Sequence, residues 1–105
     1  MDKRYHSIIE EYKKNLSSLG IRIKKVILYG SYARGKATEE SDIDLVVISD
    51  DFKNMDLWER LCILAHARIG IKEPMEILGL TENEFNEESE GTFIGDEVKT
   101  YGIEV

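Results

Sequence analysis

The order of hydrophobic and polar positions divides the chain into alternating helical and extended segments. Over residues 2–19 apolar side chains recur every three or four positions, which is the spacing of one buried helix face, and Gly20 marks the end. Residues 23–29 and 43–49 are instead rich in consecutive apolar and β-branched side chains. These runs predict strands, and the second is nearly free of polar positions, so we expect a central strand covered on both faces.

A second helical pattern occupies the middle of the chain. Asp56, with Glu59 three positions later, resembles a capping box, and the pattern predicts a helix that stops at Gly70. Cys62 falls inside it and is expected to be a small buried hydrophobic residue. The predicted buried face consists of Leu57, Trp58, Leu61, Leu64, Ala65 and Ile69.

The last third of the chain continues the alternation. We expect a strand over residues 75–80, after the only proline, and a helix start where Glu84 follows Thr81. The remaining segments are a solvated link at 87–91, a helix at about 93–101 and an edge strand at 103–105. This order of elements predicts an α/β (α+β) fold, a small mixed sheet flanked by helices.

Composition narrows the class of protein. A chain of 105 residues is expected to form a single domain, residues 1–105. Its 21 acidic residues outnumber 14 basic ones, and the net charge of −7 disfavours long nucleic acid as a partner, because like charges repel. There is no signal peptide and no apolar run of about 18 residues, so we expect a cytoplasmic location and no membrane partner.

Candidate chemistry concentrates in residues 30–44, which read GSYARGKATEESDID. Asp42 and Asp44 are two positions apart at the start of an expected strand, so both side chains project from the same face. Taken alone, such a pair is as often a solvated turn as a metal site. Asp44, however, interrupts a run that should be buried, and a buried carboxylate needs a cation. Since carboxylates are ligands that Mg²⁺ prefers, we expect a divalent metal here.

Gly30 and Ser31 end the first expected strand, and ten residues separate Ser31 from Asp42. A glycine lets the backbone approach a phosphate group, and a serine donates through its hydroxyl and its N–H; a short helix is expected at 32–36. A Gly-Ser pair alone is a common turn, but its fixed relation to the aspartates favours a phosphate site. Arg34 lies in the same loop and can neutralise phosphate charge.

A third carboxylate usually completes a two-metal site. Glu76 lies in the third expected strand between apolar neighbours, although an edge-strand residue facing water would look the same. Glu73 is the competitor, but it precedes the proline and is expected in a loop. The candidate catalytic and metal-binding residues are therefore Asp42, Asp44 and Glu76, and the chemistry they indicate is metal-assisted transfer of a phosphorus-centred group.

The strings GSYARGKA at 30–37 and SDIDLVV at 41–47 resemble the signature of the DNA polymerase β-like nucleotidyltransferase superfamily, and more narrowly the minimal nucleotidyltransferases (MNT proteins) of bacteria and archaea. The resemblance implies a polymerase β-like nucleotidyltransferase fold. It implies that the Gly-Ser pair contacts a nucleoside triphosphate and that the two aspartates hold Mg²⁺, two ions being expected. The family's third carboxylate is more usually Asp, and Glu76 holds that position here.

MNT proteins are typically paired with a small helical HEPN protein in toxin–antitoxin modules. The resemblance therefore implies an antitoxin that transfers AMP from ATP to a tyrosine of a HEPN toxin. One alternative is a catalytically weak antitoxin that acts by docking alone. Another is a small-molecule, antibiotic-type nucleotidyltransferase, which at this length would need a homo-oligomer to build its pocket. The residues by themselves indicate metal, phosphate and transfer, whereas adenine, tyrosine and HEPN rest on the resemblance.

Overall fold

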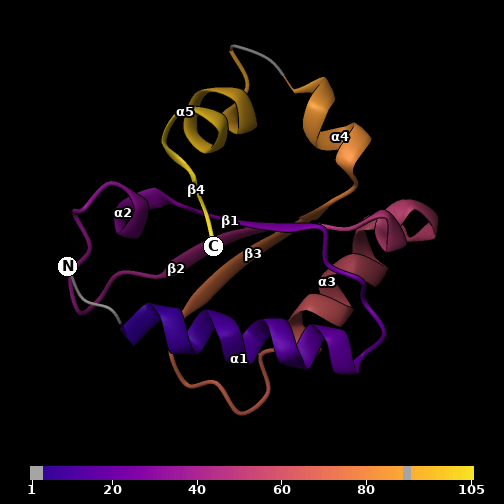
Figure 1. Ribbon diagram of the computed structural model, residues 1–105, viewed down its shortest axis with the longest axis horizontal. Coiled ribbons are helices and arrows are strands. Elements are labelled where there is room, and N and C mark those ends of the chain that lie inside the picture. Colours follow the sequence, from indigo (N-terminus) through magenta and orange to yellow (C-terminus); the bar gives the residue numbers. More distant parts are fainter. Residues whose placement is uncertain (1–3, 89–90) are drawn as a thin grey trace.

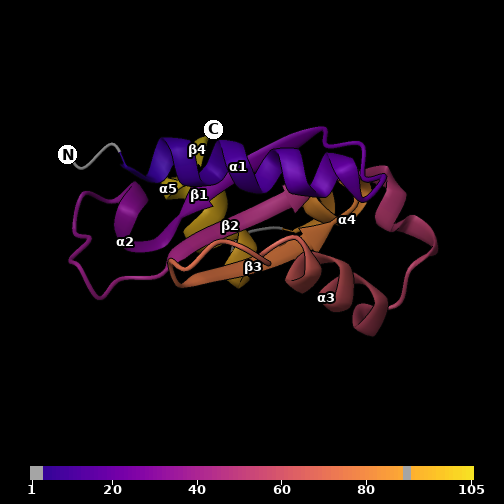
Figure 2. The same ribbon diagram turned by 90° about the horizontal axis from the view of Figure 1, so that it is seen from below.

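Helices cover both faces of a central sheet in the computed structural model, which describes residues 4–88 and 91–105 (Figures 1 and 2). Positions 2–3 of the first predicted helix and 89–90 of the predicted link lie outside the described residues. One face carries α1 (Arg4–Ser18) and α3 (Leu57–His66). The other carries α4 (Glu82–Glu87), the π-helical turn η2 (Ile94–Val98) and α5 (Lys99–Tyr101).

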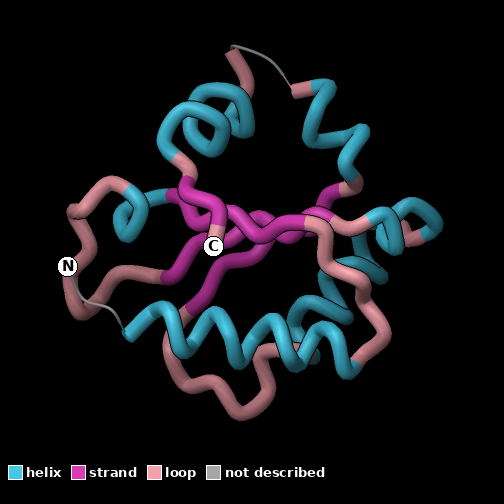
Figure 3. The backbone as a smooth tube through the Cα atoms, viewed as in Figure 1, coloured by secondary structure: helices cyan, strands magenta, loops and turns pink. Residues whose placement is uncertain are grey.

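The sheet is mixed, as predicted, and its strands gather in the middle of the molecule (Figure 3). Its order is β3-β2-β1-β4. β2 pairs parallel to β3 and antiparallel to β1, and β1 pairs antiparallel to β4. The strands are β1 (Lys25–Tyr29), β2 (Ile43–Ile48), β3 (Met75–Leu80) and β4 (Ile103–Glu104). The predicted strands, including the edge strand near the C-terminus, are therefore confirmed.

β2 is covered on both faces, which confirms the interpretation of its apolar run. Leu45 and Val47 pack in the core beneath α1 and α3, whereas Val46 and Ile48 pack in the core beneath η2. All four side chains are buried. The alternation follows from the two-residue period of a strand, which places successive side chains on opposite faces.

The predicted stripe of α1 is confirmed over most of its length. Tyr5, Ile9, Tyr12 and Leu16 are buried at the four-residue and three-residue spacing of one helix face. The Tyr12 hydroxyl donates a hydrogen bond of 2.8 Å to the backbone carbonyl of Leu64 in α3. This bond satisfies a buried polar group and joins the two helices that share this face of the sheet.

The predicted buried face of α3 is wrong. Of its six residues only Leu64 is buried, and the side chains of Leu57, Trp58 and Ile69 are 73%, 72% and 71% exposed. The prediction for Cys62 is also wrong, because this residue is exposed. The Asp56–Glu59 capping box is confirmed, with the Glu59 N–H donating to Asp56 Oδ1 at 2.8 Å. The helix begins where the sequence predicts but presents a different face to the core.

Arg60 explains the orientation of α3. Its guanidinium group donates to the Phe52 carbonyl at 2.8 Å and to the Glu84 carboxylate at 2.7 Å. It donates further bonds to the carbonyls of Met55 and Gly79. This anchor turns the side of the helix that carries Leu64 toward the sheet. Charge-assisted bonds from Arg60 therefore hold this side of the helix against the rest of the fold.

Two short helices differ from their predicted bounds. The helix expected at 32–36 is observed earlier, as α2 (Gly30–Ala33), and the helix expected at about 93–101 is divided into η2 and α5. The predicted capping box of Thr81 and Glu84 at the start of α4 is confirmed. Within the described ranges, no helix has both the length and the apolar character needed to cross a lipid bilayer.

Candidate active site

Three carboxylates meet at the edge of the sheet where β2 and β3 begin. Asp44 pairs across the parallel ladder with Glu76, so both side chains project from the same face, and Asp42 lies two positions before Asp44. One oxygen of each residue lies within 4.8 Å of the others. The structure thus brings together the three residues that the sequence nominated as a carboxylate site, including the one from a distant strand.

The electrostatics of this cluster are unfavourable for three bare anions. Burial raises the pKa of the Asp44 carboxyl from 3.8 to about 6, and the negative charges of Glu76 and Asp42 add to the rise. Asp44 is half-buried, whereas Asp42 and Glu76 are exposed. A divalent cation would relieve the repulsion, and three carboxylates are hard oxygen donors of the kind Mg²⁺ takes. The donor set therefore fits a divalent metal.

Gly30 packs directly against the Asp44 carboxylate. Its φ angle of +72° lies in the left-handed region, and a Cβ added at this position would overlap the Asp44 Oδ2 atom. The register places Tyr29, the residue before it, opposite Asp44. Ser31 follows in the first turn of α2, half-buried. The Gly-Ser turn and Asp44 are therefore in direct contact, although a polar loop separates them in the sequence.

Arg34 is held by two residues that sequence reasoning missed. Its guanidinium carbon lies 4.2 Å from the centre of the Tyr101 ring, and its Nη1 atom lies 3.8 Å from Glu97 Oε1. The charge of Glu97 also contributes to the raised pKa of Asp44. The sequence signal that could have linked these two residues is the spacing of Glu97 and Tyr101, since residues four positions apart in a helix share a face. Nothing in the sequence, however, indicated that this helix would pack over the Gly-Ser turn.

The two tyrosines that flank the Gly-Ser turn lie on opposite sides of the sheet. Tyr29 is buried beside Asp44, its ring 5.6 Å from that of Phe93, and burial raises the pKa of its hydroxyl. Tyr32 lies on the α1 side, with its ring 5.8 Å from that of Tyr5. The two rings therefore cannot act together on one bound base.

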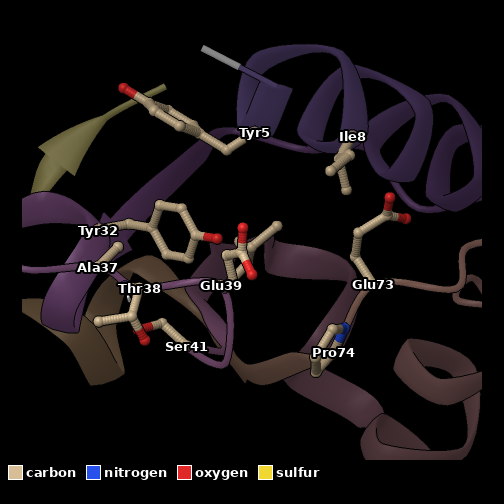
Figure 4. Close-up of a pocket in the computed structure, with 10 residues that line it drawn as sticks. Tyr5, Ile8, Tyr32, Ala37, Thr38, Glu39, Ser41, Glu73 and Pro74 are labelled. Carbon is tan, nitrogen blue, oxygen red and sulfur yellow. Dashed lines mark hydrogen bonds between the residues drawn. The ribbon is translucent and has the colours of Figure 1, made fainter. Parts of the chain in front are cut away.

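The α1 side also carries a hollow of about 500 Å³ (Figure 4). Tyr5, Tyr32 and the loop around Ser41 line it, but none of the three clustered carboxylates does. Glu39 and Glu73 do line it, so a phosphate group would be repelled there. Glu73, the competing third carboxylate, thus lies outside the cluster.

Comparisons with known proteins agree with this fold and site. Residues 9–101 match a family model described as a nucleotidyltransferase domain, so the chain belongs to that family and is a nucleotidyltransferase. It is also similar to a protein of Methanocaldococcus jannaschii described as a "putative protein adenylyltransferase". The two are 34% identical over 99 residues, which are 93% of this chain and 95% of the relative.

Two crystal structures share the fold at lower identity. A "putative nucleotidyltransferase" from Sulfolobus solfataricus has a TM-score of 0.64 at 23% identity, and the match covers 90% of this chain and 72% of that one. A toxin–antitoxin structure with AMP-PNP has a TM-score of 0.64 at 21% identity, covering 90% and 69%. The predicted polymerase β-like nucleotidyltransferase fold is confirmed.

Proposed function

We propose that this chain transfers AMP from ATP to a hydroxyl group of a partner protein, a tyrosine of a HEPN-family toxin, and thereby acts as an antitoxin. The observation that carries the proposal is the convergence of Asp42, Asp44 and Glu76 beside the Gly30 turn. The name of the M. jannaschii relative supports a protein acceptor, and the structural neighbour solved with AMP-PNP supports a toxin partner.

In this proposal each group has a separate role. Asp42, Asp44 and Glu76 would hold Mg²⁺, two ions by the usual pattern of such sites, and the bound metal would stabilise the negative charge that develops on the phosphoryl group. The Gly30–Ser31 turn binds the triphosphate through backbone N–H groups and the serine hydroxyl. Arg34 neutralises phosphate charge from the side of α5.

The transfer itself is an in-line displacement. The acceptor hydroxyl oxygen attacks the α-phosphorus, the bond from that phosphorus to the oxygen bridging the β-phosphate breaks, and pyrophosphate leaves with the electron pair. Glu76 is exposed on the edge strand β3, where an acceptor can reach it, and takes the hydroxyl proton. The toxin's tyrosine then carries AMP through a phosphodiester bond.

The decisive experiment is transfer of label from ATP labelled at the α-phosphate. The purified chain is incubated with Mg²⁺ and with the proposed partner, a HEPN-family toxin, and we expect the label on the toxin. Asp42→Asn/Asp44→Asn should abolish labelling. The matched control is Asp50→Asn/Asp51→Asn, which also removes two carboxylates but after the opposite end of β2, and it should retain labelling.

The other outcomes separate the alternatives. A tight complex with no label on the toxin would contradict transfer and favour docking alone. Label on a small hydroxylated compound, but not on the protein, would favour the antibiotic-type activity. Equal labelling by both double variants would remove the aspartates from the mechanism.

A further inference from the structure

A helix face that sequence patterning predicts to be buried is open to solvent. We define the α3 face by its apolar residues, Leu57, Trp58, Leu61, Cys62, Ala65 and Ile69. All six are exposed. They continue over the whole helix and into the turn that follows it, so they form a contiguous stripe rather than scattered residues. A contiguous exposed apolar stripe of this kind marks an interaction site.

The charges around the α3 face differ from those of the whole chain. Residues 57–70 contain one acid, Glu59, and two arginines, whereas the chain as a whole carries a net charge of −7. Arg60 is turned inward to Glu84, so the exposed arginine of this stretch is Arg68, in the turn after the helix. Glu59 and His66 lie on the same flank of the helix, near its two ends. With Cys62 and Trp58 they line a groove of about 480 Å³. Two copies of this acidic protein could therefore meet at this face without strong charge repulsion.

We propose that two copies of this chain associate through the α3 face, antiparallel about a two-fold axis near Cys62. In this arrangement Leu57 of each copy faces Ile69 of the other, and Leu61 faces Ala65, so a large residue meets a small one at the centre. Because Glu59 and His66 share a flank at opposite ends of the helix, the same pairing places each Glu59 beside the other copy's His66. The face is thus complementary to itself, which a two-fold interface requires.

The position of the carboxylates favours a second copy over the acceptor protein as the occupant. Asp44 and Glu76 project to the side of the sheet opposite Leu45 and Ile77, which pack beneath α1 and α3. The charge of Glu97 in η2 acts on Asp44 from this side. The helices α3 and α5 lie on opposite sides of the sheet (Figure 1). An acceptor must approach the carboxylates, so it meets a surface different from the α3 face. The dimer leaves both active sites open, and it does not depend on the proposed transfer reaction.

Trp58 makes the dimer directly observable, because it is the only tryptophan. We expect sedimentation velocity to show a mass change from 12.1 kDa to twice that value as concentration rises through the micromolar range, with a matching blue shift of Trp58 emission. Leu61→Asp should weaken association by about tenfold or more, because it places a charge in an apolar contact. Ile103→Asp is the matched control, since Ile103 is 40% exposed and Leu61 43%, and it should leave association unchanged.

Two further variants test the antiparallel geometry. Glu59→Lys and His66→Glu should each weaken the dimer, and the combined variant should restore it, which loss of the capping box alone would not do.

Mild oxidation should link two wild-type chains through Cys62, the only cysteine. A wild-type chain that stays monomeric with red-shifted Trp58 emission would overturn the proposal, as would a dimer that Leu61→Asp leaves intact. Shielding of Trp58 by the toxin in a monomeric chain would likewise overturn it and assign the face to the toxin.

Discussion

Asp44 is the residue at which burial and charge conflict most strongly. Its backbone belongs to the central strand β2, yet its carboxyl is pressed against Gly30 and faces Glu76. Because its pKa is raised to about 6, the folded chain holds the Asp44 proton more firmly than the unfolded chain does. The contribution of this group to folding stability is therefore present at low pH and is lost as the pH rises through about 6.

Asp44→Asn should accordingly stabilise the metal-free protein above its pKa. We expect a higher melting temperature than wild type at about pH 8, and a difference that shrinks toward about pH 5, in thermal unfolding with a chelator present. Asp50→Asn should instead lower the melting temperature at about pH 8. Hydrogen bonding to Lys24 lowers the pKa of Asp50, so its charged form stabilises the fold at neutral pH. A melting-temperature gain for Asp44→Asn that is the same at both pH values would contradict the assignment.

Gly30 offers a matched test of the close packing against Asp44. Gly30 and Gly35 have nearly equal φ angles, +72° and +71°, but a Cβ would meet Asp44 only at Gly30. Gly35→Ala should cost about 1–2 kcal/mol of unfolding free energy from backbone strain alone. Gly30→Ala should cost more in urea denaturation and should also abolish nucleotide transfer. Equal losses of stability and retained transfer in both variants would show that the Asp44 contact is unimportant.

At the scale of elements, the last helical segment, η2 and α5, supports the Gly30–Ser31 turn. β4 pairs with β1, and the Gly102 N–H donates to the Val98 carbonyl at 2.8 Å, so the chain end holds η2 and α5 in place. A Cβ at Gly102 would overlap that carbonyl and approach Ile27, which shows how closely this segment packs. Through Tyr101, the same segment reaches Arg34 beside the Gly-Ser turn.

Loss of the Tyr101 ring should therefore weaken ATP binding. A cation–π contact at an exposed site contributes about 0.5–1 kcal/mol, so Tyr101→Leu should raise the KM for ATP by roughly two- to fivefold with little change in kcat. Tyr101→Phe keeps the ring and should behave as wild type in steady-state kinetics. If both variants bind ATP equally well, the ring does not position Arg34.

For the whole molecule, a divalent ion would join the starts of two strands that meet only through tertiary folding. Mg²⁺ should raise the melting temperature, because a ligand that binds only the folded state stabilises it by about 2.7 kcal/mol at one hundred times its dissociation constant. Asp44→Asn should lose most of this gain and Asp50→Asn should keep it. Equal gains in both variants would place the ion elsewhere.

The sequence by itself determined the strands, the first helix stripe, both capping boxes and the identities of the three carboxylates. These features depend on local periodicity and on polar residues that interrupt apolar runs, which are visible without a fold. Glu76 stands where Asp is more usual, and only the parallel pairing of β2 with β3 shows that its side chain lies beside the two aspartates. Tertiary structure alone also decided that Arg60 would turn the apolar side of α3 outward and that Tyr101 would meet Arg34. Such contacts join residues far apart in the chain, and no local pattern records which distant group a side chain will meet.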